Sequence, residues 1–162
     1  FIGHHEPDYE KYVSEITNKD ISFFLGGPGW HSSNISKSKI AFNDFNEKIY
    51  PEVINKSSAG LGLYSTWNRN ISSGRIFEIP ATGAALIVKR NTFIESLYKE
   101  DSEAIFFDNP VELRLKIDDL FKNRDLLQEI ASNGYQRCLS NQCTWDDRVK
   151  EAINFLIIEK II

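Results

Sequence analysis

The chain of 162 residues has no methionine, two cysteines and no long hydrophobic run. The two thiols, Cys138 and Cys143, lie close together, which favours reduced packing residues over a disulfide framework. No apolar run approaches the roughly 18 residues that a membrane helix needs, and no signal peptide is visible. A basic run is also lacking, and the net charge of −4 argues against a general nucleic-acid binder.

What is present is the composition of an ordinary globular protein, with 41% hydrophobic and 26% charged residues. A chain of this length can bury enough surface for one core, so we expect a single domain over residues 1–162. The chain opens on Phe1 within an apolar triplet and contains no methionine. We therefore expect it to be half of a longer polypeptide.

Short apolar runs alternate with helical patterns. The runs predict strands at 1–3, 21–25, 40–42, 59–65, 83–89 and 103–108, and the helical spacing predicts helices near 9–16, 46–56 and 92–97. Asn109-Pro110, with Glu112, predicts a capped helix start. Three amphipathic helices follow. The residues expected to be buried are Leu113, Ile117, Leu120 and Phe121 in the first helix. They are Leu127, Ile130, Ala131 and Cys138 in the second helix, and Trp145, Val149, Ala152, Ile153 and Leu156 in the third.

Strands that are apolar throughout are buried on both faces, so helices must cover both sides of the sheet. The predicted fold class is therefore α/β: a doubly wound, Rossmann-like parallel sheet with helices on both faces and a helical C-terminal segment. In such sheets, ligands bind where the carboxyl ends of the strands open into loops.

The segment SSGRIFE (72–78) lies at one of these loops and is the strongest candidate site. Arg75 and Glu78 are one helical turn apart, after a Ser73-Gly74 loop that can bring backbone N–H groups close to a ligand. A helix N-terminus and a guanidinium both suit phosphate, and Glu78 could accept hydrogen bonds from the hydroxyls of a ribose. The alternative is a surface ion pair between the two side chains. Pro80 requires the helix to be short, or to start close to it.

Two other loops at the same edge are weaker candidates. In GHH (3–5), Gly3 permits close backbone approach, and His4 or His5 could donate to a phosphate or a sugar; the alternative is a pair of surface imidazoles, and no third ligand supports zinc. GGPGWH (26–31) could cradle a nucleotide, although it lacks the Lys and Ser/Thr of a P-loop. Its alternative is a tight turn with Trp30 packed beneath it.

The order of these segments resembles the carboxyl-terminal half of group 1 retaining glycosyltransferases with the GT-B fold, in particular the spore-maturation, CgeB-like type. The resemblance rests on FIGHHEPDYEKY (1–12), FFLGGPGWH (23–31), GRIFEIPATGAALIVKRN (74–91) and the closing segment from EAIFFDNP to TWDDRV (103–149). It implies that residues 1–162 are the nucleotide-sugar-binding half of a two-domain enzyme whose N-terminal acceptor domain is absent.

By that resemblance, the chain binds a nucleoside-diphosphate sugar and serves hexosyl transfer to an acceptor, with retention and with no cofactor or metal. Arg75 and Glu78 are the implied catalytic residues. The implied donor-binding residues are Gly3, His4, Asn70, Ser73, Gly74, Arg75 and Glu78, with base contacts from Ala41–Phe45. Asn70 stands where many relatives carry a glutamate that touches the donor sugar, which leaves the sugar open. The resemblance also implies a cytoplasmic protein, with any membrane contact made through the missing domain.

Three alternatives remain open at this point. A non-catalytic nucleotide-binding or interaction module of the same fold would agree with the departure at Asn70. A receiver-like signalling domain would need an aspartate at the end of the central strand, where LGLYST (61–66) offers none. A sugar-nucleotide epimerase of this fold would need further acidic and histidine residues.

Overall fold

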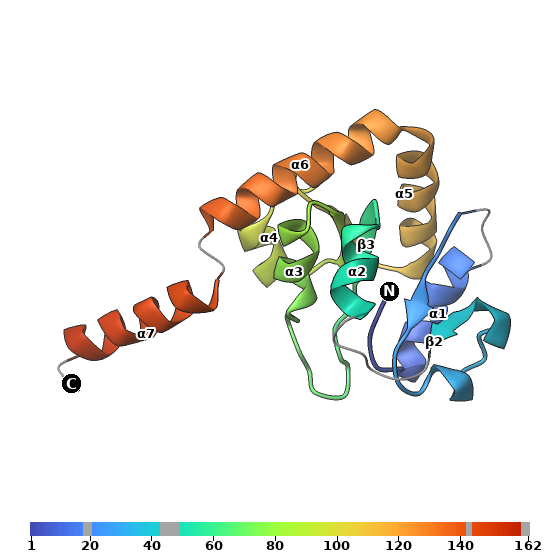
Figure 1. The fold of residues 1–162 in the computed structure, drawn as a ribbon, viewed down its shortest axis with the longest axis horizontal. Helices are drawn as coiled ribbons and strands as arrows, with labels where there is room; N and C mark the ends of the chain where they lie inside the picture. The colour runs from blue at the N-terminus through green and yellow to red at the C-terminus, as the bar shows by residue number, and fades with distance from the viewer. Residues whose placement is uncertain (18–20, 43–48, 142–143, 160–162) are drawn as a thin grey trace.

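The computed structural model describes residues 1–17, 21–42, 49–141 and 144–159 (Figure 1). The elements are α1 (Pro7–Thr17), β1 (Leu25–Gly26), the short 3-10 helices η1 (Trp30–Ser32) and η2 (Lys37–Lys39), β2 (Ile40–Phe42), α2 (Ile49–Asn55), β3 (Ala59–Gly62), α3 (Arg75–Ala81), β4 (Ala85–Lys89), α4 (Thr92–Leu97), β5 (Ile105–Phe107), α5 (Pro110–Lys122), α6 (Arg124–Ser140) and α7 (Trp145–Ile158). Within these ranges, no helix combines the length and the hydrophobicity needed to cross a bilayer.

The strands pair in parallel and form two groups. β1 pairs with β2, and Ile2 bridges Gly26, so the first residues of the chain run alongside β1. The second group has the order β3-β4-β5. The run 21–25 was predicted to be a strand throughout, but only Leu25 enters β1, whose register shifts between Leu25 and Gly26.

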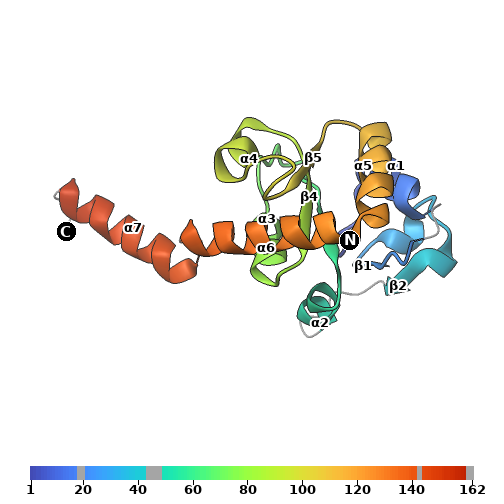
Figure 2. The ribbon, with the colours of Figure 1, turned by 90° about the horizontal axis from the view of Figure 1, so that it is seen from above.

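Helices cover both faces of the sheet, and alternate strand residues show which face each helix covers. Ile87 and Phe107 pack in one core with residues of α1, α5 and the first half of α6. Their neighbours Val88 and Phe106 point the other way, into a second core with residues of α3 and α4. Figure 2 shows the strands between these two layers. The predicted doubly wound α/β fold is confirmed.

Local signals placed most helices correctly. α1 buries the predicted residues Tyr9, Tyr12, Val13 and Ile16, and α5 and α6 bury their predicted faces, with Phe121 half-buried. Asn109 caps α5 as expected, its side chain accepting a hydrogen bond from the Glu112 backbone at 3.0 Å. Cys138 is buried in α6, and its Sγ donates to the Phe77 carbonyl oxygen at 3.6 Å. Cys143 lies outside the described residues.

The buried face predicted for α7 is wrong at the four of its residues whose side chains the structure describes, and the side chain of Trp145 lies outside the described part. Val149 and Ile153 are 54% and 44% exposed, Ala152 is exposed, and Leu156 is half-buried. α7 projects away from the rest of the molecule (Figure 1). It starts on a capping box, in which Thr144 and Asp147 exchange hydrogen bonds between side chain and backbone. The apolar period therefore predicted a helix correctly, but a period does not identify what, if anything, lies against the apolar face.

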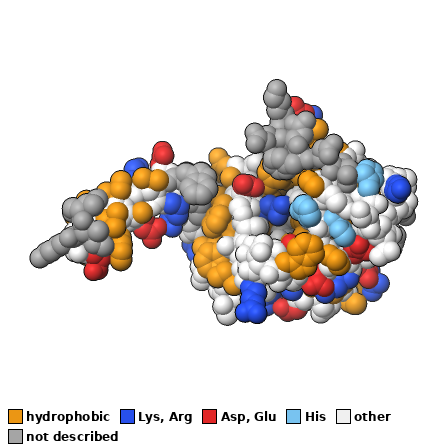
Figure 3. Space-filling model, turned by 90° about the horizontal axis from the view of Figure 1, so that it is seen from below, with side chains coloured by type: hydrophobic (Ala, Val, Ile, Leu, Met, Phe, Trp, Pro, Cys, Tyr) orange, Lys and Arg blue, Asp and Glu red, His pale blue; other side chains and the backbone are white. Residues whose placement is uncertain are grey.

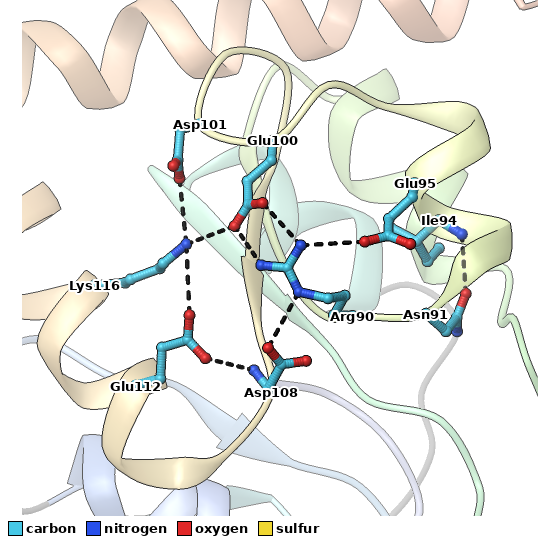
Figure 4. Close-up of polar contacts among 9 residues, drawn as sticks. All are labelled: Arg90, Asn91, Ile94, Glu95, Glu100, Asp101, Asp108, Glu112 and Lys116. Carbon is cyan, nitrogen blue, oxygen red and sulfur yellow. Dashed lines mark hydrogen bonds and ion pairs between the residues drawn. The ribbon is translucent and has the colours of Figure 1, made fainter.

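A polar network clamps the carboxyl ends of β4 and β5 (Figure 4). Arg90 donates through both terminal nitrogens to Glu100, at 2.6 and 2.8 Å, and also contacts Glu95 and Asp108 at 3.2 Å. Lys116, on α5, donates to Glu100 at 2.8 Å. The charged groups of these side chains are hydrogen-bonded to one another. The loop at residues 89–92 is therefore a structural clamp rather than a site for a ligand.

Replacing Glu100 by glutamine is expected to destabilise the protein in a pH-dependent way. Arg90 hydrogen bonds, opposed by burial, lower the pKa of Glu100 to about 2. A lowered folded-state pKa stabilises the protein above the unfolded value, and this contribution is lost as the pH falls from about 4.5 towards 2. Because the side chain is 31% exposed, we expect a loss of about 1 to 2 kcal/mol at pH 7.

Urea unfolding at a series of pH values measures this difference. It should be largest near pH 7 and shrink as the pH approaches 3. Asp101→Asn is the control, because this carboxylate is 65% exposed and contacts Lys116 at 3.4 Å; its effect should stay below about 0.5 kcal/mol. A Glu100→Gln effect that does not change with pH would rule out the charge as its cause.

Candidate functional site

The candidate site lies where the two groups of strands part. The chain passes from residues 1–3 to β1 and β2 on one side, and from β3 to β4 and β5 on the other. The switch point therefore falls between residues 1–3 and β3, and ligands of doubly wound sheets bind at the carboxyl edge of such a point. Figure 3 views the molecule from this edge and shows histidine, basic and acidic side chains gathered beside hydrophobic ones.

Arg75 is held at the end of the first extended segment. Its Nε donates to the Ile2 carbonyl oxygen at 2.7 Å, and its guanidinium lies 5.1 Å from the centre of the Phe1 ring. A side chain at Gly3 would collide with the guanidinium. No described residue accepts a hydrogen bond from the two terminal nitrogens of Arg75.

The backbone just before α3 adds further donors. The N–H groups of Ser73, Gly74 and Arg75 have no acceptor among the described residues. Gly74 is exposed, and its carbonyl oxygen accepts from the N–H groups of Phe77 and Glu78, both at 3.0 Å. The predicted helix is short, as Pro80 required: α3 has seven residues. Its dipole is correspondingly small, so successive amides and the guanidinium supply most of the positive character.

Glu78 is hydrogen-bonded to Tyr50, a partner that the sequence did not suggest. The Tyr50 hydroxyl, from α2, donates to Glu78 Oε2 at 2.7 Å. Burial, together with the Glu78 carboxylate, raises the pKa of Tyr50, so the phenol stays a hydrogen-bond donor. Within the described ranges, no ion pair joins Glu78 to Arg75, so the alternative of a surface ion pair between them is not what the structure shows.

The loop GGPGW forms the wall beside Gly3. Trp30 is fully buried, and its Nε1 donates to the Gly3 carbonyl oxygen at 2.8 Å. Gly27 has φ of 121° and lies directly against the backbone of Gly3, where any side chain would be both strained and blocked. The loop is thus a tight turn with Trp30 packed beneath it, and its role is to fix Gly3.

The two histidines of the first loop differ. His4 is exposed, and its Nδ1 donates to the His5 carbonyl oxygen at 2.8 Å. His5 is largely buried and contacts Glu10 at 2.7 Å. Burial acts to raise the pKa of Glu10, but hydrogen bonds from Asn34 and His5 outweigh it and lower that pKa. No cluster of three or more metal-ligating side chains occurs in the part of the chain that the structure describes.

Asn70 lies in an exposed loop, and its backbone N–H donates to the Ser65 carbonyl oxygen at 3.1 Å. The Arg75 guanidinium lies beside Gly3, and a backbone hydrogen bond joins Gly74 to Glu78. No hydrogen bond or ion pair between described residues joins the side chain of His4 or Asn70 to these residues. Of the expected base-binding region, Ala41 is exposed and the Phe42 ring lies 5.5 Å from that of Phe24. Residues 43–45 lie outside the described residues.

Sequence reasoning missed two residues of the site. One is Tyr50, described above. The other is Glu6, a buried carboxylate that accepts a hydrogen bond from the Thr66 backbone at 3.1 Å and contacts the Tyr9 hydroxyl at 3.5 Å. Burial, followed by the Glu6 charge, raises the pKa of Tyr9 to about 12. The position of Glu6, an acidic residue in the loop after the predicted strand 1–3, was a signal that could have identified it. The sequence around Tyr50 contains no such signal.

A cavity of about 590 Å³ opens in the gap between the first segment and β3. Phe1, Ile2 and Phe24 line one side and Gly60 and Leu61 the other, so the interior is mostly apolar. Arg75 and Tyr50 also border it. The cavity lies where the two groups of strands, in the described residues, are not hydrogen-bonded to each other. Because the interior is mostly apolar, a charged ligand would bind more favourably at the polar edge outside the cavity.

The fold is that of a Rossmann-like domain, and the Arg75 guanidinium and the amides of Ser73–Arg75 lie at its switch point. The sequence profile of the Glycosyl transferase-like family matches residues 10–154, and the chain belongs to this family. No curated protein matches the chain in sequence.

The chain is also similar to solved structures of Alr3699/HepE from Anabaena. The complex with UDP and glucose has a TM-score of 0.75 at 14% identity, covering 95% of this chain and 47% of HepE. The complex with UDP gives 0.75 at 12% identity, covering 95% and 48%. The complex with UDP-glucose gives 0.66 at 12% identity, covering 85% and 43%. The likeness establishes the fold, and the chain spans about half the length of HepE.

Proposed function

We propose that residues 1–162 form the donor-binding, C-terminal domain of a retaining, metal-independent group 1 glycosyltransferase of GT-B fold, of the CgeB-like type. The observation that carries the proposal is the run of amides at Ser73–Arg75, which find no acceptor in the described ranges, beside the Arg75 guanidinium at the switch point of the sheet. The family supports sugar transfer as the reaction class. The UDP and UDP-glucose bound by HepE support a nucleoside-diphosphate sugar as the donor.

The donor diphosphate would bind at these amides and at the two terminal nitrogens of Arg75. Planar guanidinium and successive backbone N–H groups both match phosphate oxygens. Gly3 leaves room beside the guanidinium, and exposed His4 can donate through its remaining ring nitrogen when protonated. In this arrangement Ser73 contributes through its backbone, because its hydroxyl is buried.

Glu78 would hold the ribose. The Tyr50 hydroxyl uses one lone pair of Glu78 Oε2, so Oε1 and the remaining lone pair of Oε2 can accept hydrogen bonds from vicinal hydroxyls. Asn70 would lie toward the sugar, where a neutral amide can both donate and accept. The sugar specificity would therefore differ from that of relatives with a glutamate at this position.

The chemistry follows from charge. A nucleoside diphosphate leaves as an anion, so positive groups fixed around its oxygens stabilise the transition state for its departure. Arg75 and the amides of Ser73–Arg75 are such groups, and their hydrogen bonds strengthen as negative charge develops on the leaving oxygen. The acceptor would be bound by another domain, since HepE is about twice as long.

Calorimetry of the chain with UDP, UDP-glucose and matched guanine and adenine nucleotides tests the proposal. We expect one nucleoside diphosphate to bind with Kd on the order of 0.1 to 1 mM, since half of the cleft would be absent, and we expect no sugar transfer. Turnover by these 162 residues alone would contradict the division into donor and acceptor domains.

The second candidate is a non-catalytic nucleotide-binding or interaction module of the same fold. Asn70, in place of the glutamate of many relatives, is the observation that favours it. A module that has lost its donor site would bind no nucleotide sugar in the same panel. Binding of a nucleoside diphosphate without discrimination between sugars would point to a module that retains only the diphosphate subsite.

A further inference from the structure

Glu6 links the two loops that border the switch point. It follows the first extended segment, and its carbonyl oxygen accepts from the Tyr9 N–H at 2.9 Å at the start of α1. Its carboxylate reaches across to the backbone of Thr66, four residues beyond the end of β3. Glu6 is 7% exposed and is the one buried acidic residue in the part of the chain that the structure describes. A buried carboxylate is unfavourable unless its hydrogen bonds compensate.

The loop that Glu6 holds, residues 65–74, has few other attachments. Its turns are internal: Asn70 N–H donates to the Ser65 carbonyl oxygen, and Arg69 N–H to that of Thr66. Its large apolar side chains, Trp67 and Ile71, are 67% and 62% exposed and so do not anchor it in a core.

From outside the loop, described side chains hold it at two points. Glu6 accepts from Thr66 near one end, and Asn91 donates to the Ile71 carbonyl oxygen at 2.8 Å near the other.

We propose that Glu6 is a positioning residue that holds loop 65–74 against the first loop, so that the amides of Ser73–Arg75 face the donor. Asn91 is the second anchor. This inference rests on the proposed donor site but assigns Glu6 no contact with the donor. Loss of the anchor lowers the fraction of molecules with the loop in its binding-competent position, and the apparent Kd rises in proportion.

The test combines a measurement without ligand and one with UDP. Arg69 is exposed, with φ of 52°, in the middle of the loop, so trypsin cleavage after it reports loop opening. Cleavage after Lys122, exposed at the end of α5, is the internal reference. Glu6→Ala is expected to accelerate cleavage after Arg69, relative to Lys122, and to weaken UDP binding, each on the order of tenfold.

Two further variants separate positioning from general stability. The amide oxygen of Glu6→Gln can still accept from Thr66 N–H, so this variant should stay within about threefold of the wild type in both measurements. Asn91→Asp keeps the cap of α4, where Asn91 Oδ1 accepts from Ile94 N–H at 2.9 Å, but loses the donor to Ile71. It should change cleavage and UDP affinity in the direction of Glu6→Ala, even if Glu6→Ala itself fails to fold.

The outcomes are distinct. Unchanged relative cleavage after Arg69 in both Glu6→Ala and Asn91→Asp overturns the anchoring role. Faster cleavage with unchanged UDP affinity also overturns it, because the loop would then not position the donor. If the wild type binds none of the uridine, guanine and adenine nucleotides while cleavage responds as expected, the proposed function fails and the anchoring of the loop stands.

Discussion

Arg75→Lys is expected to weaken UDP binding by about ten- to a hundredfold while the fold persists. Lysine keeps one positive charge but lacks the planar fork of the guanidinium, in which Nε donates to the Ile2 carbonyl oxygen while the two terminal nitrogens face a phosphate. Hydrogen bonds to charged groups contribute about 1.5 to 3 kcal/mol each. In an enzyme that contains both domains, the rate should fall by about 10² to 10³, the usual effect of removing one transition-state donor.

Calorimetry measures the affinity, and urea unfolding of the same sample shows whether the fold has changed. Arg114→Lys is the matched control, because Arg114 is 40% exposed and pairs with Glu15 on the outer surface at 3.6 Å. That variant should bind UDP like the wild type. If Arg75→Lys did so too, the diphosphate could not lie at Arg75 and the proposed site would be wrong.

Gly134→Ala is expected to destabilise the protein by about 2 to 3 kcal/mol, although alanine is the better helix former by about 1 kcal/mol. A Cβ atom at position 134 would lie 2.5 Å from the Glu103 carbonyl oxygen and 3.8 Å from Cβ of Pro80. The obstacle is backbone, which cannot rotate away as a side chain could. α6 can cross the loop before β5 this closely because it has glycine at the crossing.

Urea unfolding followed by tryptophan fluorescence, to which buried Trp30 contributes, gives the free-energy difference. Ser132→Ala is the control in the same helix: Ser132 is exposed, so the substitution should be neutral or stabilise by about 0.5 kcal/mol. Equal stability of Gly134→Ala and wild type would mean that α6 can move outward at little cost.

The fold was predictable where the signals are local. The Asn109 cap, the period of α1 and the apolar run of β4 each lie within a few residues and were read correctly. The burial of α7 was not predictable in the same way, since exposure depends on what packs against a helix. The run 21–25 shows the same limit, because a strand also needs a partner of matching length, and β2 has three residues.

The candidate site was half predictable. Arg75 and Glu78 are three residues apart, so their spacing and the preceding glycine marked them. Their actual partners are distant in sequence: Ile2 for Arg75 and Tyr50 for Glu78. The link between Glu6 and Thr66 spans 60 residues. Such pairs are created by the order of strands in the sheet, which brings the ends of remote segments to one edge, and single-residue patterns do not encode that order.

The projecting helix α7 should affect measurements of thermal unfolding by circular dichroism. Among the residues of this 14-residue helix whose side chains the structure describes, none is buried, so α7 depends on its capping box and its own backbone hydrogen bonds. Isolated helices of this length are marginal in water. On warming, the far-ultraviolet circular dichroism of the chain should therefore begin to decline by fraying of α7 before the sheet melts. A two-state fit to that signal would understate the cooperativity of the core, which amide hydrogen exchange at β4 would report directly.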